Sequence, residues 1–231
     1  QDSIADMAAL FIANMRRRQP EGPYRLAGHS FGGVVAWEMA CQLQAAGAEV
    51  AGLCLFDSSL TRPDDAWQAG QPEARVAARD LAAAVQVFAR FTDSQMSLDE
   101  AQLARLSVTE QLDSAAKLMA SGIGSQQAAR QMVEGLLRIS NSHRAARLAY
   151  RPASPSAPVV LFQAAQSDHQ EAGALSGQPW RDIASGSFEV QTVPGDHVTM
   201  MAPPHVAVLA KALQKALDQQ AAKHQDPRRQ G

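Results

Sequence analysis

The sequence has little of several features that would define a function by themselves. It contains only two cysteines, Cys41 and Cys54, in 231 residues. Both lie in apolar surroundings, so we expect two buried free thiols, one in a helix and one in a strand, rather than a disulfide framework. This pattern fits a reducing cytoplasm, which is the location we expect.

Long apolar runs and an excess of charge are also missing. No apolar run approaches the length of a membrane span, and no charged-then-apolar signal segment opens the chain. The formal net charge is only -2, which argues against a nucleic-acid footprint or an electrostatic membrane anchor. Hydrophobic residues make up 46% of the chain, enough for one globular domain with a sizeable core.

Short apolar segments alternate with helical patterns along much of the chain. The predicted strands are 24–27, 49–56, 158–164 and 188–193, and the predicted flanking helices are 4–18, 34–46 and 205–220. A strand, a helix and a second strand in succession favour a parallel sheet with a right-handed crossover. We therefore expect an α/β fold, in which helices flank a mostly parallel sheet.

Residues 64–150 interrupt this alternation. Residues 73–150 show helical patterns without a strand signal, and Ser97 with Glu100 and Ser107 with Glu110 match the capping box of a helix start. An insertion at the carboxyl ends of parallel strands lies where such sheets bind ligands. We expect the block to form a helical lid over the site, the alternative being extra packing.

The segment from Gly28 to Gly32, Gly-His-Ser-Phe-Gly, matches the nucleophile elbow between a strand and a helix. Its sharp turn would expose the Ser30 hydroxyl, and the N–H of Phe31 at the helix start would stabilise an oxyanion. We expect glycine at Gly28 and Gly32 because side chains there would collide. His29 is interpreted as a packed or hydrogen-bonded structural histidine rather than a catalytic one.

A general base should follow the nucleophile on a loop after the last strand. His197 comes directly after the strand at 188–193 and before the final helix, and His205 is the alternative. The carboxylate that orients this base could be Asp57 or Asp168, since each follows a predicted strand. Asp196 is poorly placed to reach the ring of its own neighbour.

Several segments together resemble the thioesterase domains that end nonribosomal peptide and polyketide synthases, which have the α/β-hydrolase fold. The segments that carry the resemblance are 20–33, 34–40, 53–58, 150–152, 160–164 and 194–201. In that family the acid commonly follows the strand after the elbow helix, so the resemblance favours Asp57 over Asp168. Stand-alone editing thioesterases resemble the Asp168 arrangement instead.

The resemblance implies a mechanism and a partner. An acyl or peptidyl carrier protein, expected upstream in the same synthase, would present the chain as a thioester on phosphopantetheine. Ser30 would take the chain as an oxyester, and water or an internal nucleophile would release it by hydrolysis or macrocyclisation. No metal or bound cofactor is implied. The alternatives are a stand-alone editing thioesterase or small-molecule esterase and, in a different class, a non-catalytic binding module.

The chain departs from this family at its beginning. Only 29 residues precede Ser30, whereas such domains have about sixty or more before the elbow, by the resemblance. We therefore expect a single hydrolase domain at 1–231 that lacks its N-terminal strands. The missing part would also hold the loop that donates the second oxyanion N–H.

Overall fold

A computed structural model describes residues 3–60, 71–92, 94–166 and 177–224. The chain folds into two compact units. The first unit combines Gln1–Arg62 with Ala149–Gly231, and the second comprises Pro63–Leu148. The first unit holds the sheet and the candidate site, and the second is helical.

The first unit is built on a four-stranded sheet that is parallel throughout. Its strands are β1 (Tyr24–His29), β2 (Val50–Phe56), β3 (Val159–Ala164) and β4 (Phe188–Val193). They lie side by side in the order in which they occur along the chain. This confirms the predicted parallel sheet, although β1 runs on to His29, two residues beyond its predicted end.

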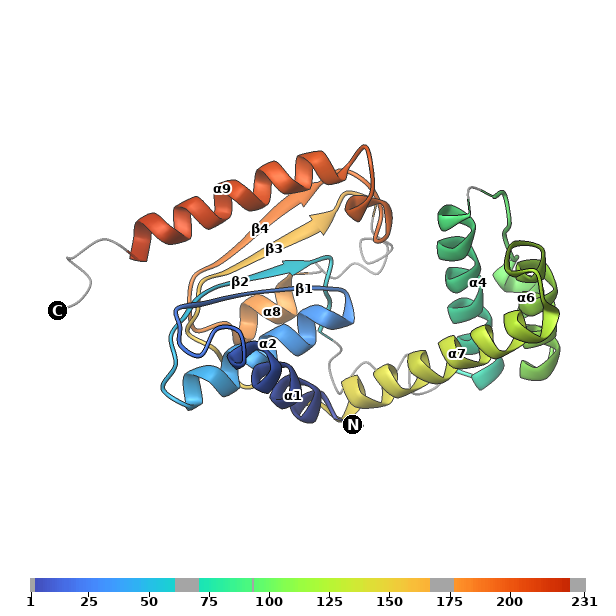
Figure 1. The fold of residues 1–231 in the computed structure, drawn as a ribbon, viewed down its shortest axis with the longest axis horizontal. Coiled ribbons are helices and arrows are strands. Elements are labelled where there is room, and N and C mark those ends of the chain that lie inside the picture. Colours follow the sequence, from blue (N-terminus) through green and yellow to red (C-terminus); the bar gives the residue numbers. More distant parts are fainter. Residues whose placement is uncertain (1–2, 61–70, 93, 167–176, 225–231) are drawn as a thin grey trace. The chain divides into compact units, whose positions relative to one another are not determined.

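Helices cover both faces of this sheet. On one face lies α9 (Val206–His224), and on the other lie α1 (Ile4–Arg16), α2 (Phe31–Ala45) and α8 (Gln178–Ile183) (Figure 1). The short helix α8 was not predicted, because six residues give too little periodicity to recognise. Its Trp180 is fully buried and lies against Trp37 of α2, with 4.6 Å between the ring centroids.

A core of apolar side chains joins the sheet to α9. Its buried members are Cys54, Phe56, Val160, Phe162, Ala164, Val193, Met200, Leu209 and Ala216. Five of these nine come from β2 and β3, and Phe56 stacks on Phe162. This packing fixes the strand ends at which the candidate catalytic groups lie.

The second unit is a helical cluster with a core of its own. Its helices are α4 (Glu73–Phe91), α5 (Glu100–Leu103), α6 (Val108–Ile123) and α7 (Gln126–Ala149), the last ending one residue beyond the unit. The buried core residues are Ala78, Leu81, Val85, Leu103, Ala115, Ala116, Met119, Ala129 and Val133. Its role as a lid stays a prediction.

The two predicted capping boxes have different outcomes. Ser107 and Glu110 form the reciprocal box at the start of α6. The prediction for Ser97 is wrong, because α5 is capped by Asp99, whose carboxylate accepts a 3.0 Å hydrogen bond from the N–H of Gln102. Asp is as good a cap as Ser, so the motif alone did not locate the first turn.

The thiols and the membrane prediction can also be compared with the structure. Cys41 and Cys54 are both free, as expected, but only Cys54 is fully buried and Cys41 is partly exposed. None of the helices in the described ranges combines the length and apolar character needed to cross a bilayer.

Candidate active site

The register of the sheet brings the last residues of β1 and β2 level with each other and with Phe162, two residues before the end of β3. His29 pairs with Phe56, and Phe56 pairs with Phe162. The chain continues this pairing one step further, because the N–H of Ser30 donates to the Phe56 carbonyl at 3.0 Å and that of Asp57 donates to the Phe162 carbonyl at 2.7 Å. Ser30 and Asp57 are thus anchored on neighbouring strands at the carboxyl edge.

The backbone at Ser30 turns sharply between β1 and α2. Its φ of 54° and ψ of −123° lie where non-glycine residues are strained, and its side chain does not cap α2. Strain of this kind at a serine between a strand and a helix is typical of a nucleophile elbow. The side chain is thereby left available for chemistry.

The glycines around this turn differ in how tightly the structure constrains them. A Cβ on Gly28 would overlap the carbonyl of Gly32, and a Cβ on Gly33 would overlap the side chain of Ser58. A Cβ on Gly32 would meet no atom within 4 Å. The predicted steric need for glycine is therefore right for Gly28 and wrong for Gly32, since the crowding falls on the next residue, Gly33.

His197 and Asp57 form a directly bonded pair. The Nδ1 atom of His197 lies 2.7 Å from Oδ2 of Asp57, and the other carboxylate oxygen accepts a 3.0 Å hydrogen bond from the N–H of Ala164. The Asp57 side chain is 1% exposed, whereas that of His197 is 41% exposed. The buried carboxylate therefore sets the Nδ1–H tautomer and leaves Nε2 as the atom that can accept a proton.

The loop that carries His197 is closed by its own side chains. Gly195 has a φ of 98°, and Oδ1 of Asp196 accepts hydrogen bonds from the N–H groups of Val198 and Thr199 at 2.9 and 2.8 Å. In return, Oγ1 of Thr199 accepts from the N–H of Asp196 at 2.8 Å. Asp196 thus holds the loop rather than the ring of His197, in keeping with the sequence argument.

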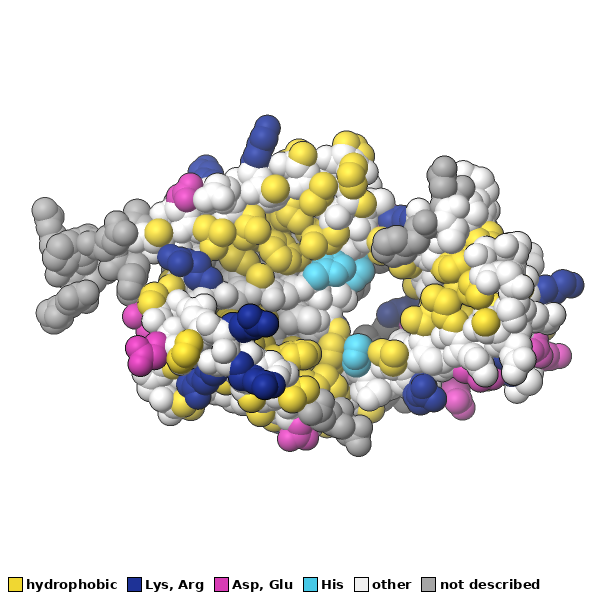
Figure 2. Space-filling model, viewed as in Figure 1, with side chains coloured by type: hydrophobic (Ala, Val, Ile, Leu, Met, Phe, Trp, Pro, Cys, Tyr) yellow, Lys and Arg dark blue, Asp and Glu magenta, His cyan; other side chains and the backbone are white. Residues whose placement is uncertain are grey.

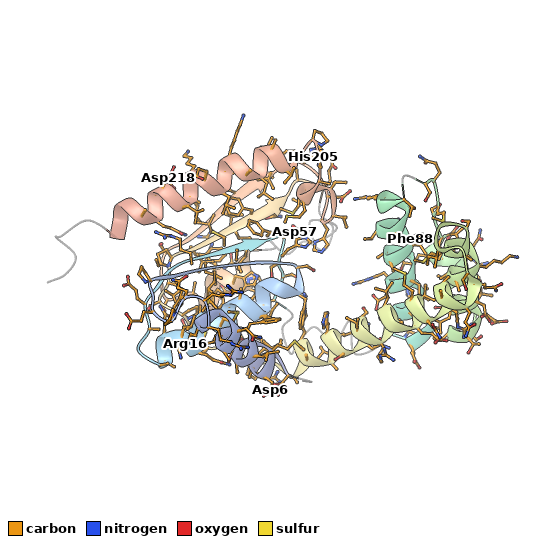
Figure 3. All side chains as sticks on the ribbon, in the orientation of Figure 1. Asp6, Arg16, Asp57, Phe88, His205 and Asp218 are labelled. Carbon is orange, nitrogen blue, oxygen red and sulfur yellow. The ribbon has the colours of Figure 1, made fainter. Side chains whose placement is uncertain are left out.

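Ser30, Asp57 and His197 all belong to the carboxyl edge of the sheet. Figure 3 shows Asp57 at the end of β2, and histidine side chains are visible on the surface near this edge in Figure 2. Within the described part of the chain, no hydrogen bond joins the Ser30 hydroxyl to His197. Such bonds are often long without substrate and tighten in the complex.

The other site residues predicted from the sequence have different outcomes in the structure. His205 lies just before α9 (Figure 3), and of the described histidines only His197 is bonded to Asp57. Asp168 lies outside the described residues. Phe31 is the first residue of α2, directly after Ser30, and its role as an oxyanion donor stays a prediction.

His29 has a partner that the sequence did not reveal. Its Nε2 lies 2.8 Å from the main-chain carbonyl oxygen of His197, and the two rings are 4.7 Å apart, centroid to centroid. This confirms that His29 is hydrogen-bonded, and it shows that the partner is the candidate base. Its structural role stays a prediction. Burial lowers the pKa of His29, although the bond to the carbonyl partly opposes the shift.

Two hydrogen bonds at Asp57 and its neighbour Ser58 could not be found from the sequence alone. The N–H of Ala164, at the end of β3, bonds Asp57, and the indole N–H of Trp180 donates to the Ser58 carbonyl at 2.8 Å. Both contacts join segments more than a hundred residues apart. Trp180, a tryptophan in a polar stretch, was the available sequence signal for a buried contact, and it did not identify Ser58 as its partner.

The sequence also contains a basic stretch, which we interpret as a solvated helix face, the alternative being contact with an acidic carrier protein or a phosphopantetheine phosphate. Arg144 is bound by Asp80, with Nη1 3.1 Å from Oδ2, so part of its charge is already neutralised. Burial lowers the pKa of Arg147 to about 10. The alternative, that His143, Arg144, Arg147 and Arg151 contact a carrier protein or a phosphate, stays a hypothesis. In the described ranges, no three His, Cys, Asp or Glu side chains are grouped as a metal site would need.

The fold agrees with solved structures of thioesterase domains. The NocB thioesterase domain, solved as a covalent complex with a fluorophosphonate nocardicin G analog, is 26% identical with a TM-score of 0.54, covering 93% of this chain and 75% of that one. The four-domain nonribosomal peptide synthetase AB3403 matches with a TM-score of 0.72 at 24% identity, over 94% of this chain and 16% of that chain. Fold and site thus define an α/β-hydrolase domain with an Asp–His pair beside an elbow serine.

The chain belongs to the thioesterase domain family, whose model matches residues 1–217. Among curated relatives is the probable non-canonical nonribosomal peptide synthetase CymA from Salinispora arenicola. It is 27% identical over 222 residues, which cover 94% of this chain. The chain spans only 3% of the length of CymA.

Proposed function

We propose that the chain is a chain-releasing thioesterase, which removes an acyl or peptidyl group from the phosphopantetheine arm of a carrier protein. The observation that carries this proposal is the bonded pair of His197 and buried Asp57 at the same sheet edge as Ser30. Membership of the thioesterase family supports a thioester as the bond that is attacked.

In the first half of the reaction, Ser30 becomes acylated. His197 Nε2 takes the proton of the Ser30 hydroxyl as its oxygen attacks the thioester carbonyl carbon. The N–H of Phe31 stabilises the negative charge on the carbonyl oxygen, assisted by the start of α2. The intermediate collapses, the carbon–sulfur bond breaks, and the thiol leaves with the proton that His197 carried.

In the second half, the oxyester on Ser30 is cleaved by a second nucleophile. Water, or a hydroxyl or amine of the bound chain, loses a proton to His197 and attacks the ester carbonyl. The carbon–oxygen bond to Ser30 breaks, and His197 returns the proton to the Ser30 oxygen. Water gives a free acid, whereas an internal nucleophile gives a lactone or lactam. Asp57 stays ionised and stabilises the imidazolium in both halves.

The comparisons support this proposal at two points. CymA and AB3403 are nonribosomal peptide synthetases by description, so a carrier protein is the partner that we propose for this chain. The NocB thioesterase domain has been captured with a fluorophosphonate-based ligand, a class of reagent that reacts with activated serines. By analogy, we propose that Ser30 is the residue that such a reagent would modify.

The first test is covalent labelling with a fluorophosphonate probe, read by peptide mass spectrometry. We expect one label on Ser30, no label in Ser30→Ala, and labelling slowed by about 10³-fold or more in His197→Ala. Absence of label from folded wild-type protein would remove the enzyme proposal and favour a binding module.

The second test distinguishes release from other hydrolase activities. The probe is a carrier protein loaded with an acyl-phosphopantetheine thioester, compared with a simple ester of the same acyl group. We expect acyl-Ser30 to form from the carrier-bound thioester with the larger kcat/KM. A preference for the simple ester would favour a small-molecule esterase. A preference for short acetyl groups over long chains would favour an editing thioesterase.

A further inference from the structure

We propose that His29 is a positioning residue, which holds the candidate base His197 at a fixed place relative to Ser30. This proposal rests on the function proposed above. It is motivated by a hydrogen bond of 2.8 Å between Nε2 of His29 and the main-chain carbonyl oxygen of His197. The bond runs between the residue directly before the candidate nucleophile and the candidate base itself.

The chemistry of this bond fixes the protonation of His29. A carbonyl oxygen can only accept a hydrogen bond, so Nε2 of His29 must carry the proton. Burial lowers the pKa of the ring, and the neutral Nε2–H tautomer satisfies the carbonyl. A neutral ring also suits the neighbouring site, because His197 becomes positively charged during turnover and its ring lies 4.7 Å away.

The bond gives His197 a second anchor on the sheet. Its ring is held from β2 through Asp57, and its main chain is held from β1 through His29. The internal hydrogen bonds of Asp196 and Thr199 fix the loop shape but do not attach it to β1 or β2. His29 therefore supplies the link to the strand that carries the nucleophile.

The elbow makes this link stiff. His29 is paired in register with Phe56, and the next residue, Ser30, is bonded to the Phe56 carbonyl. Gly28, on the other side of His29, packs so closely on Gly32 that no side chain fits. His197 is thus linked to the backbone of Ser30 through one hydrogen bond, the His29 side chain and one peptide unit. Errors of about 1 Å in the placement of a catalytic group can cost about 100-fold in rate.

Two substitutions separate the hydrogen bond from the packing of the ring. His29→Phe keeps an aromatic ring beside His197 and removes the donor. His29→Gln places an amide N–H near the position of Nε2 and keeps the donor. We expect His29→Phe to lower the rate constant for fluorophosphonate labelling of Ser30 by about 10- to 100-fold, and His29→Gln to restore most of it. The probe concentration at half-saturation should change little, since His29 acts on reactivity rather than on binding.

Proton NMR on histidine-labelled protein reads the same contact without relying on labelling. In the wild type we expect His29 as the Nε2–H tautomer and a low-field signal from the Nδ1–H of His197. The His197 signal should broaden in His29→Phe and return in His29→Gln.

An Nδ1–H tautomer at His29, or a His29→Phe variant whose labelling rate and His197 signal both equal the wild type, would overturn the proposal. If wild-type Ser30 resists the probe, the proposed function fails while the NMR result still decides the role of His29. If His29→Phe does not fold, the wild-type tautomer and His29→Gln decide it.

Discussion

His197 Nδ1 lies 2.7 Å from Asp57 Oδ2, although the two residues are separated by 140 positions in the chain. The contact joins the end of β2 to the loop after β4, across the end of β3. It shows that Asp57, one of the two carboxylates that the residues alone left open, is bonded to the ring, and its assignment as the acid stays a prediction. The function of that bond is open to direct measurement.

The first prediction concerns this carboxylate. Asp57→Asn should lower turnover by roughly 10⁴-fold, because an amide favours the wrong imidazole tautomer and cannot stabilise the imidazolium. Asp168→Asn is the matched control and should stay within a few-fold of wild type. The measurement is kcat/KM on an acyl thioester, with circular dichroism to check the fold. A large loss in Asp168→Asn with little change in Asp57→Asn would reverse the assignment.

The second prediction concerns the glycines of the elbow. Gly28→Ala should lower the free energy of unfolding by about 2–3 kcal/mol, because its Cβ would overlap the Gly32 carbonyl and backbone must move. Gly32→Ala is the control and should be neutral or raise stability by up to about 1 kcal/mol, since its Cβ meets open space within a helix. Urea titration of both variants checks this. Equal losses in the two would contradict the difference in packing.

These glycines illustrate how far the sequence could predict the site. The period of apolar residues located the strands and most helices, and the pentapeptide located Ser30, because both signals are local. The crowding is at Gly33 rather than Gly32 because of Ser58, which lies two residues after the end of β2. The bonds from His29 to His197 and from Ala164 to Asp57 likewise join distant segments. Such contacts depend on the strand register, which the pattern of one chain does not encode residue by residue.

The third prediction concerns the loop that carries His197. Thr199→Val removes the oxygen that accepts from the N–H of Asp196, so the free energy of unfolding should fall by about 1 kcal/mol. Labelling of Ser30 should slow by about 10-fold, because the base is less well placed. Thr199→Ser keeps the oxygen and should behave like wild type in both assays. A Thr199→Ser variant as slow as Thr199→Val would show that the methyl group matters instead.

The fourth prediction concerns stability at acid pH. The pKa of His29 is lowered from 6.5, chiefly by burial. The charge of His197 lowers it further, whereas the bond to the His197 carbonyl and the charge of Asp57 oppose the shift. Because the unfolded chain then binds a proton more readily than the folded one, His29 contributes stability that is fully present above about pH 6.5. That stability is lost as pH falls through the folded pKa. Replacing His29 with Gln should therefore flatten the fall in unfolding free energy between pH 7.5 and 5. Urea titrations at four pH values compare the slopes. A steeper fall in the variant would give the wrong sign.

The last prediction separates the serine from the two thiols as the reactive nucleophile. Burial raises the pKa of Cys54 to about 11 and that of Cys41 to about 12, so at pH 8 only about one thiol in a thousand, or fewer, is ionised. Iodoacetamide should therefore modify the folded protein slowly, and pretreated protein should still label at Ser30 with the fluorophosphonate probe. In 8 M urea both cysteines should react and two carboxamidomethyl groups should appear by mass, which confirms that the reagent is competent. Fast alkylation of the folded protein, with loss of probe labelling, would instead point to a thiol at the reactive centre.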